Sequence, residues 1–271
     1  METKLNYKRT FLIGLAFLSI CSFWQMYDNI IPLILQNTYH LGETMTGAVM
    51  ALDNVLAIFL LPVFGALSDK VHTKLGRRMP FIVAGTILAV IFMMLLPMID
   101  NAEKARWNTG ESFSNQVIFL AVLFFTLVSM GLYRSPAVAL MPDVTPNHLR
   151  SRANAVINLM GAVGGVYALI MIKVLVGKGE TPDYLPLFAS IAAVMAIAVG
   201  ILVITIRENK LREEVEKAEA ANAGTIEEKA MAEGVEAAGE IEAVGDTGEV
   251  KSFDGKKQTG KTEAPRVCPR K

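Results

Sequence analysis

Residues 65 to 78 read Gly65-Ala66-Leu67-Ser68-Asp69-Lys70-Val71-His72-Thr73-Lys74-Leu75-Gly76-Arg77-Arg78. This stretch is rich in polar and basic residues, yet it lies between two long apolar blocks. An α-helix needs about 20 apolar residues to cross the ~30 Å hydrocarbon core of a bilayer, and both blocks have that length. The stretch is therefore predicted to be a short loop outside the membrane that joins two membrane-spanning helices.

Hydropathy divides most of the chain into six such blocks. The 271 residues are 52% hydrophobic and 19% charged, with a mean hydropathy of +0.41. The apolar residues are gathered in blocks of 21 to 26 residues and are not spread as in a soluble core. The expected spans are residues 11–36, 47–67, 79–99, 117–141, 153–176 and 185–206. We therefore expect an all-α membrane protein whose residues 1–206 form one six-helix transmembrane bundle.

The basic residues of the short loops are unequally shared between the two sides of this bundle. One side carries twelve lysines and arginines, among them Lys8, Arg9, Arg77, Arg78 and Arg150, and the other side carries three. Short loops rich in Lys and Arg stay on the cytoplasmic side of a membrane. Both termini are therefore expected in the cytoplasm, with the bundle in the plasma (inner) membrane.

Composition changes abruptly after Ile206. Residues 207–221 combine helix formers with charge pairs four residues apart, such as Glu213 and Lys217, which predicts a short, charged cytoplasmic helix. Residues 222–271 contain too few large apolar residues to offset the entropy cost of ordering them. We predict that they form a disordered cytoplasmic tail, or the beginning of a linker between two halves.

Ionisable and polar side chains interrupt the first two spans. A charge at the centre of a membrane helix costs about 2.5 to 3.5 kcal/mol on insertion scales, so such residues indicate a polar interior. At a rise of ~1.5 Å per residue, Asp28 lies about 25 Å above the cytoplasmic start of its helix and Asp53 about 9 Å below the outer start of the next. Two carboxylates at similar depth can share a proton or a small cation, although each can also be a satisfied structural carboxylate. The candidate substrate- or cation-binding residues are Trp24, Gln25, Tyr27, Asp28, Asp53 and Asn54.

Asp69 ends the second span, where the helix macrodipole is unfavourable to an anion, so we expect a cationic partner for it. The candidates are Arg77, Arg78 and Arg134. Arg134 lies about 25 Å along the fourth span from the outer side, which puts it near the level of Asp69. We expect a structural or gating ion pair for Arg134, with direct substrate contact as the alternative.

Several function classes receive no support from the sequence. His40, His72 and His148 fall in different loops without metal-ligand spacing, and no pattern of nucleophile and base is present. We therefore expect no catalytic residue, no metal site and no cofactor, and we do not expect an enzyme. The two cysteines, Cys21 and Cys268, do not make a disulfide framework. A net charge of zero gives no support for nucleic-acid binding.

Two stretches carry a resemblance to known transporters. Gly65-x-Leu67-Ser68-Asp69-Lys70, followed after five residues by Gly76-Arg77-Arg78, resembles the signature loop between helices two and three of the major facilitator superfamily. The second stretch is Tyr133-Arg134-Ser135-Pro136-Ala137-Val138-Ala139-Leu140-Met141-Pro142-Asp143, followed by Arg150-Ser151-Arg152-Ala153-Asn154-Ala155. It is similar to the fourth-to-fifth helix region of plant-type sucrose carriers and their bacterial relatives. Together they make the chain similar to the N-terminal half of glycoside-pentoside-hexuronide:cation symporters and sucrose carriers.

This resemblance implies a secondary active transporter that takes up a sugar with a cation by alternating access. The residues it assigns to the gating or signature loop are Gly65, Asp69, Gly76, Arg77 and Arg78, with Gly65 permitting close contact with a helix of the other half. It also matches Arg134 to the arginine of helix four, and it places Asp28 where sugar or cation contacts are common. The paired aspartates of sodium-coupled relatives are replaced here by Ala57 and Leu61, which favours a proton over sodium.

Other interpretations stay open on the sequence alone. The signature loop is shared with exporters of drugs or metabolites, and a truncated, non-transporting membrane protein is a further alternative. Because the superfamily uses two six-helix bundles, six spans imply a truncated reading frame, a half-size protein that pairs, or a protein that no longer transports. The expected partners are a small-molecule sugar, a coupling proton, the lipid bilayer, and a second six-helix half or a second copy of the chain.

Overall fold

The structure is a computed structural model, and it describes residues 6–71, 73, 76–107, 116–177, 182–206, 208–217 and 220. The main helices are α1 (Tyr7–Asn37), α2 (Glu43–Lys70), α3 (Met79–Trp107), α4 (Gln116–Asp143), α5 (Arg150–Leu175) and α6 (Leu185–Thr205), with a short 3-10 helix, η1 (Asn147–Leu149), before α5. Within these residues, six helical stretches are long and apolar enough to cross a membrane. The prediction of an all-α bundle of six apolar helices is confirmed.

The first four helices extend beyond the apolar blocks that predict them. For example, α1 begins at Tyr7 where the apolar block begins at Phe11, and α3 continues to Trp107 where the block ends at Ile99. Hydropathy marks only the part of a helix that matches the hydrocarbon core, whereas backbone hydrogen bonding continues into polar flanking residues. The bounds of α5 and α6 lie within three residues of the expected ones.

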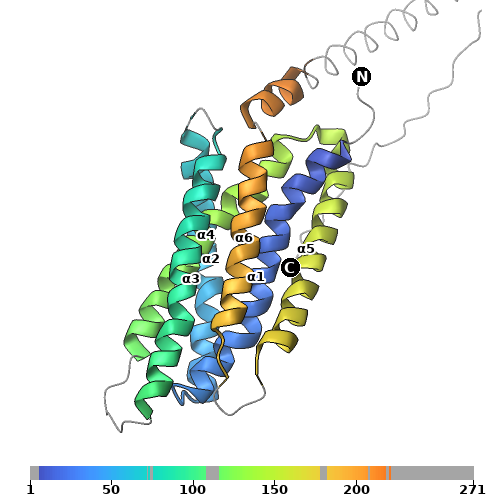
Figure 1. Cartoon of the computed structure of the whole chain (residues 1–271). Helices are drawn as coiled ribbons and strands as arrows, with labels where there is room; N and C mark the ends of the chain where they lie inside the picture. Colours follow the sequence, from blue (N-terminus) through green and yellow to red (C-terminus); the bar gives the residue numbers. More distant parts are fainter. Residues whose placement is uncertain are drawn as a thin grey trace, which may run out of the picture. The chain divides into compact units, whose positions relative to one another are not determined.

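The helices pack along their whole length into one bundle (Figure 1). The most extensive pairs are α1 with α5 and α3 with α4, followed by α2 with α4, α3 with α6 and α1 with α6. Glycine permits the closest approach, between α1 and α5. A Cβ atom on Gly164 would collide with the backbone carbonyl of Leu18. The hydroxyl of Ser22 lies 2.8 Å from the carbonyl oxygens of both Leu18 and Gly164, so a polar contact supports the seam.

The apolar interior lies on the inner faces of α1, α3, α4 and α6. Phe23, Met26, Ile30 and Ile34 of α1 are each at most 1% exposed, so this face packs inside the bundle. In contrast, the most apolar window of α2 contains no buried residue. The large apolar side chains of α2 therefore lie on the surface of the bundle, and Phe59 is 66% exposed.

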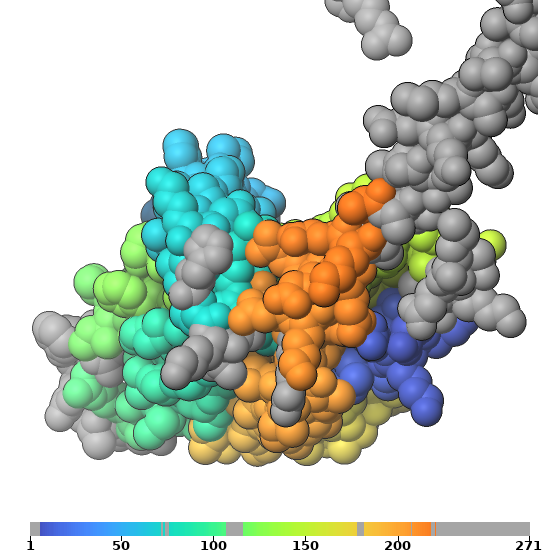
Figure 2. Space-filling model, turned by 90° about the horizontal axis from the view of Figure 1, so that it is seen from above, coloured from blue at the N-terminus to red at the C-terminus, as the bar shows by residue number. Residues whose placement is uncertain are grey.

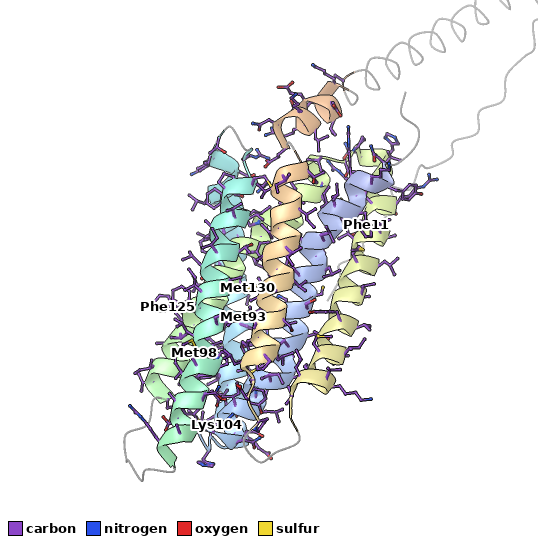
Figure 3. All side chains as sticks on the ribbon, in the orientation of Figure 1. Phe11, Met93, Met98, Lys104, Phe125 and Met130 are labelled. Atoms are coloured by element: carbon purple, nitrogen blue, oxygen red, sulfur yellow. The ribbon has the colours of Figure 1, made fainter. Side chains whose placement is uncertain are left out.

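A buried carboxylate of α3 organises a set of contacts at the end of the bundle where Lys104 is labelled in Figure 3. Asp100 is fully buried, and its carboxylate accepts hydrogen bonds from Thr38 Oγ1 at 2.7 Å and Lys104 Nζ at 2.6 Å. Lys104 Nζ also donates to the Pro182 carbonyl and lies 4.5 Å from the centre of the Tyr184 ring. Burial, and then the charge of Asp100, raise the pKa of the Tyr184 phenol. This contact set ties α1 and α3 to the segment before α6.

A further helical segment, residues 208–217, follows α6. It lies at the end of the bundle where α3 begins, beside the residues that lead into α3 (Figure 2). Residues 208–217 fall within the range 207–221 in which a charged helix is expected. The predicted disorder of residues 222–271 lies outside the described residues, so it stays a prediction.

Candidate functional site

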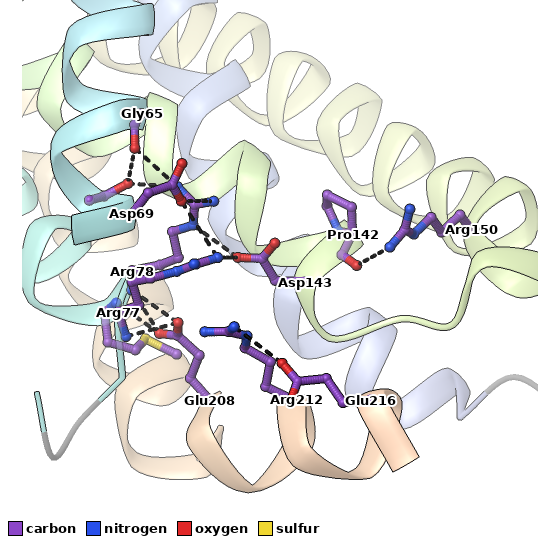
Figure 4. A network of polar contacts seen from close by, with 12 residues as sticks. Gly65, Asp69, Arg77, Arg78, Pro142, Asp143, Arg150, Glu208, Arg212 and Glu216 are labelled. Atoms are coloured by element: carbon purple, nitrogen blue, oxygen red, sulfur yellow. Dashed lines mark hydrogen bonds and ion pairs between the residues drawn. The ribbon is translucent and has the colours of Figure 1, made fainter. Parts of the chain in front are cut away.

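Two sets of polar residues are candidates for function, and the first lies at the end of the bundle where α2 ends and α3 begins. We call this set the loop network: Gly65, Ser68, Asp69, Gly76, Arg77, Arg78, Asp143 and Glu208. Figure 4 shows most of its members from close by. Arg78 pairs with Asp69 at 2.6 Å and with Asp143 at 2.9 Å. Arg77 pairs with the same two carboxylates, at 3.5 Å and 3.1 Å. The two arginines therefore bind the end of α2 to the end of α4.

Glu208 caps the beginning of α3. Its carboxylate accepts backbone N–H groups from Arg77 at 2.9 Å, from Arg78 at 3.0 Å and from Met79 at 3.1 Å. Glu208 is fully buried. The first N–H groups of a helix have no partner within the helix, and the helix dipole favours an anion there. Glu208, in the segment that follows α6, thus stabilises the start of α3.

Gly76 is required by both backbone conformation and space. Its φ is +130°, a region that L side chains rarely adopt, and an added Cβ would collide with the carboxylate of Glu208. Thr73 Oγ1 donates to the Gly76 carbonyl at 2.6 Å, and the Thr73 carbonyl accepts from Asn209 Nδ2 at 3.1 Å. The loop before α3 is therefore shaped around the segment that follows α6.

Gly65 lies against α4. A Cβ on Gly65 would lie 3.3 Å from the hydroxyl of Ser135, which donates to the Leu61 carbonyl at 2.8 Å. The Gly65 carbonyl accepts from Ser68 Oγ at 2.8 Å and lies 3.4 Å from Arg78 Nη1. Ser68 is buried and accepts a 2.6 Å hydrogen bond from Arg78 Nη1. Within this chain, Gly65 serves the contact between α2 and α4.

The second set lies inside the membrane-spanning part of the bundle, around a small pocket that is partly open to the surface. Its walls come from α1, α2 and α4. The residues that line it are Trp24, Asp53, Leu56, Ala57, Leu60, Leu61, Leu127, Gly131 and Arg134. The guanidinium carbon of Arg134 lies 5.4 Å from the centre of the Trp24 ring, within the range of a cation–π contact. The pocket thus has apolar walls with one carboxylate, one guanidinium and one indole.

Two of the remaining predicted binding residues, Tyr27 and Asn54, contact residues that line this pocket. The Trp24 and Tyr27 rings meet edge to face at 5.4 Å. Asp28 follows Tyr27 on α1 and is exposed. Asn54 Nδ2 donates to Asp53 Oδ1 at 3.0 Å. Gln25 follows Trp24 on α1. Its amide oxygen faces α5 and lies 3.7 Å from the position that a Cβ of Gly165 would occupy.

The structure places Arg134 away from Asp69, with which the sequence analysis grouped it. Arg134 was expected near the level of Asp69, as one of its possible partners. Asp69 instead pairs with Arg77 and Arg78, and Arg134 lies over Trp24 in the pocket. The rise per residue gives only the distance along a helix. It does not give helix tilt or the direction of a long side chain, and these two place the guanidinium in the pocket.

Sequence reasoning missed two acidic members of the loop network. Asp143 was quoted only as part of a motif, and Glu208 was counted only among the charges that follow the sixth span. The signal for Glu208 was weak but present. It is an acidic residue directly beyond a span, on the side of the bundle whose loops are basic. For Asp143 the comparable signal is its place at the last position of α4, on the same side as Arg77 and Arg78.

The six long apolar helices of the described part of the chain, packed into one bundle, define an integral, multi-pass membrane protein. The family model described as Major Facilitator Superfamily matches residues 7–246, and the chain belongs to that superfamily.

Curated relatives are plant sucrose transport proteins. The chain is 35% identical over 116 residues to sucrose transport protein SUC4 of Arabidopsis thaliana, a match that covers 40% of this chain and 22% of that protein. It is 26% identical over 137 residues to sucrose transport protein SUT3 of Oryza sativa subsp. japonica, covering 48% of this chain and 27% of that protein. These matches span only about a quarter of the relatives' own length.

Proposed function

We propose that this chain is the sugar- and proton-binding bundle of a secondary active transporter that takes up a sugar by alternating access. The observation that carries the proposal is the pocket lined by Trp24 and Asp53, with the Tyr27 ring packed edge to face against Trp24. Carboxylates and amides accept hydrogen bonds from sugar hydroxyls, and aromatic rings offer an apolar face with a polar edge. The similarity to sucrose transport proteins supports a sugar as the substrate.

In this proposal a proton is the coupling ion and the two carboxylates hold it. Like charges that lie close together favour binding of one proton between them. Neither carboxylate forms an ion pair within 4 Å with any residue that the structure describes. No cationic side chain in that part of the chain therefore neutralises them in place of a proton. Asp28, on the exposed side of α1, is the residue through which we expect the proton to enter.

The loop network is proposed to hold the cytoplasmic side closed. It joins α2, the start of α3, the end of α4 and the segment after α6 by ion pairs and caps that must break if these elements separate. Two packed arrangements of such a network can act as the two states of a gate. Both termini would then lie in the cytoplasm, with the bundle in the plasma membrane.

We further propose that a second six-helix bundle covers the face formed by α2. Its surface combines exposed apolar side chains, such as Phe59, with the polar pair of Asp53 and Asn54. Lipid does not solvate a carboxylate well, so such a face needs protein or water against it. The second bundle is either a separate second half or a second copy of this chain.

Replacing Asp28 by Asn should abolish proton-driven accumulation of sugar. The amide has nearly the same shape but binds no proton, so sugar binding can persist while the gradient no longer drives uptake. The measurement uses the chain in vesicles, alone and with a second six-helix half, and follows labelled sugar under an inside-alkaline gradient. Glu43→Gln, which removes an exposed carboxylate at the start of α2, is the matched control and should accumulate sugar normally. Normal accumulation by Asp28→Asn would refute the role given to Asp28.

Phe59→Cys should form a disulfide-linked dimer on oxidation if the partner bundle is a second copy. The background for this test is the chain with both native cysteines replaced by Ser, because it contains no other thiol. Phe59 is 66% exposed on α2. The control is Ile204→Cys, whose position is 84% exposed on α6, away from the proposed interface. Equal cross-linking at the two positions would show random collision in the bilayer and would rule out a specific dimer through α2.

A further inference from the structure

Arg134 lines the pocket, and the direction of its side chain needs an explanation. Within the described part of the chain its guanidinium forms no hydrogen bond and no ion pair, and its contact is the face of the Trp24 ring at 5.4 Å. A long side chain loses rotamer freedom when it is held in one place, and a single cation–π contact offsets little of that loss. The direction of the side chain must therefore be set by the backbone of α4.

The two residues next to Arg134 bind α4 to neighbouring helices on opposite flanks. Successive residues of an α-helix point about 100° apart, so Tyr133 and Ser135 lie on the two sides of Arg134. Ser135 Oγ donates to the Leu61 carbonyl of α2 at 2.8 Å. Tyr133 is fully buried, and its hydroxyl donates to the Ala16 carbonyl of α1 at 3.1 Å. These two hydrogen bonds resist rotation of α4 about its own axis.

The contacts of Tyr133 leave little room for another arrangement. Its Oη also lies 2.7 Å from Ser19 Oγ, and the two hydroxyls share the Ala16 carbonyl as an acceptor. A Cβ on Gly85 would lie 2.6 Å from the backbone nitrogen of Tyr133, so α3 packs directly on the backbone of α4 at this residue. A buried hydroxyl that loses its partner is costly, so the rotation that keeps these bonds is favoured.

The backbone of α4 is weakened at the same place. Pro136 lies inside α4 and has no N–H, so the Leu132 carbonyl lacks the helical hydrogen bond that residue 136 would otherwise donate. A helix bends most easily where such a bond is missing. Tyr133 and Ser135 fall within this turn, where side-chain contacts have to replace the missing backbone bond.

We propose that Tyr133 and Ser135 are positioning residues, which hold α4 in the rotation that aims Arg134 at the Trp24 ring. Neither residue lines the pocket, so both act through Arg134. The inference rests on the proposed function and deepens it by naming the residues that keep the guanidinium of the pocket in place. A misplacement of about 1 Å at a site can cost about 100-fold in rate, so losing a hydroxyl outside the pocket is expected to reduce transport.

The fluorescence of Trp24 reports on the position of Arg134. The chain has two tryptophans, so Trp107→Phe leaves Trp24 as the sole one. A positive charge held over the indole shifts its emission maximum, and Arg134→Gln should remove that shift. The full chain in the Trp107→Phe background is measured in nanodiscs of uncharged lipid, with excitation at the red edge, where tyrosine does not absorb.

Tyr133→Phe and Ser135→Ala should each move the emission maximum toward that of Arg134→Gln. In the Arg134→Gln background neither should move it further, because changes that act through one group are not additive. Tyr39→Phe is the matched control for the tyrosine, since Tyr39 is 8% exposed and its hydroxyl has no hydrogen-bond partner within the described residues. Ser129→Ala is the control for the serine, since Ser129 Oγ donates to a carbonyl of α4 itself. Both controls should leave the emission unchanged.

Transport gives the second readout. Sucrose is the probe, and its accumulation under an inside-alkaline gradient is measured in vesicles that contain the chain with a second six-helix half. Tyr133→Phe should lower the rate of accumulation about 10- to 100-fold, as expected for a displaced binding group. Tyr39→Phe should accumulate sucrose normally.

Three results would overturn the inference. Unchanged emission for Tyr133→Phe and Ser135→Ala, where Arg134→Gln shifts it, means that the two hydroxyls do not position the guanidinium. No shift for Arg134→Gln means that the guanidinium does not lie over Trp24. Additive shifts in the double variants mean that the hydroxyls affect Trp24 without Arg134.

Two further results separate this inference from folding and from the proposed function. If Tyr133→Phe does not stay monodisperse, Ser135→Ala with its Ser129→Ala control decides the same question. If the emission changes as expected but the parent chain accumulates no sucrose, the proposed transport is removed and the positioning role is supported.

Discussion

Replacing Glu208 by Gln should lower the melting temperature of the bundle by roughly 5 to 10 °C, because a buried carboxylate that caps a helix loses its charge. The carboxylate accepts three backbone N–H groups at the start of α3, and the amide that replaces it presents a donor toward these donors. Removing one member of a buried charged network costs about 3 to 5 kcal/mol, and a neutral, isosteric amide keeps part of the hydrogen bonding. The measurement is the fraction of protein that stays monodisperse after heating in detergent.

Glu214→Gln is the matched control for this experiment. Glu214 also follows α6, but it is 60% exposed and pairs at 2.9 Å with Arg9, which is itself 45% exposed. Exposed pairs are worth about 0 to 1 kcal/mol, so the melting temperature should change little. If Glu208→Gln and Glu214→Gln lowered stability equally, the cap on α3 would not stabilise the bundle as described.

Replacing Gly164 by Ala should separate α1 from α5 and lower the melting temperature by roughly 3 to 8 °C, since overpacking costs about 1 to 3 kcal/mol. The added Cβ would collide with the Leu18 carbonyl group, whose carbon lies 2.8 Å from the Cβ position. The backbone of α1 cannot rotate away as a side chain can. Alkylation of Cys21 offers a second measurement, because its sulfur lies in the same seam, 2.9 Å from where a Cβ of Gly161 would be. In a Cys268→Ser background, Cys21 should react faster once the seam opens.

Gly165→Ala provides a control one residue away on the same helix. The atom nearest to its added Cβ would be Gln25 Oε1 at 3.7 Å, which is ordinary van der Waals contact. Alanine is the better helix former by about 1 kcal/mol, so this change should be neutral or stabilising. A loss of stability for Gly165→Ala as large as that for Gly164→Ala would contradict the account of the seam.

Much of the fold could be predicted from the sequence because a bilayer imposes a simple rule. Each apolar block of about 20 residues has one stable solution, a helix that satisfies its own backbone hydrogen bonds. The stretch from Gly65 to Arg78 predicted the connection between the second and third spans. The pairing of Asp69 with Arg77 and Arg78 could also be expected, because all three residues lie in this short connection. Which helices pack against one another was harder to predict from the sequence. The hydropathy of α2 resembles that of the other helices, yet its most apolar window contains no buried residue.

The candidate sites depend on contacts between residues that are distant in the sequence. Glu208 lies 130 residues beyond Arg78, and no local pattern predicts that its carboxylate returns to cap α3. Arg134 was placed correctly along α4, but the direction of its side chain depends on Trp24 of another helix. Both contacts join residues that are far apart in sequence, so they require the relative placement of helices. That placement follows from close packing at particular positions such as Gly164, where single atoms decide the approach.

Movement of protons together with the sugar is the measurement that shows whether this bundle couples the two. Vesicles containing the chain, alone or with a second six-helix half, are loaded with a pH indicator and given sugar with no imposed gradient. Coupled entry predicts that the lumen becomes acidic in proportion to the sugar taken up, and that Asp28→Asn abolishes this acidification while Glu43→Gln does not. Sugar that enters with no change in internal pH would contradict proton coupling. Absence of sugar entry both alone and with a second half would contradict transport by this bundle.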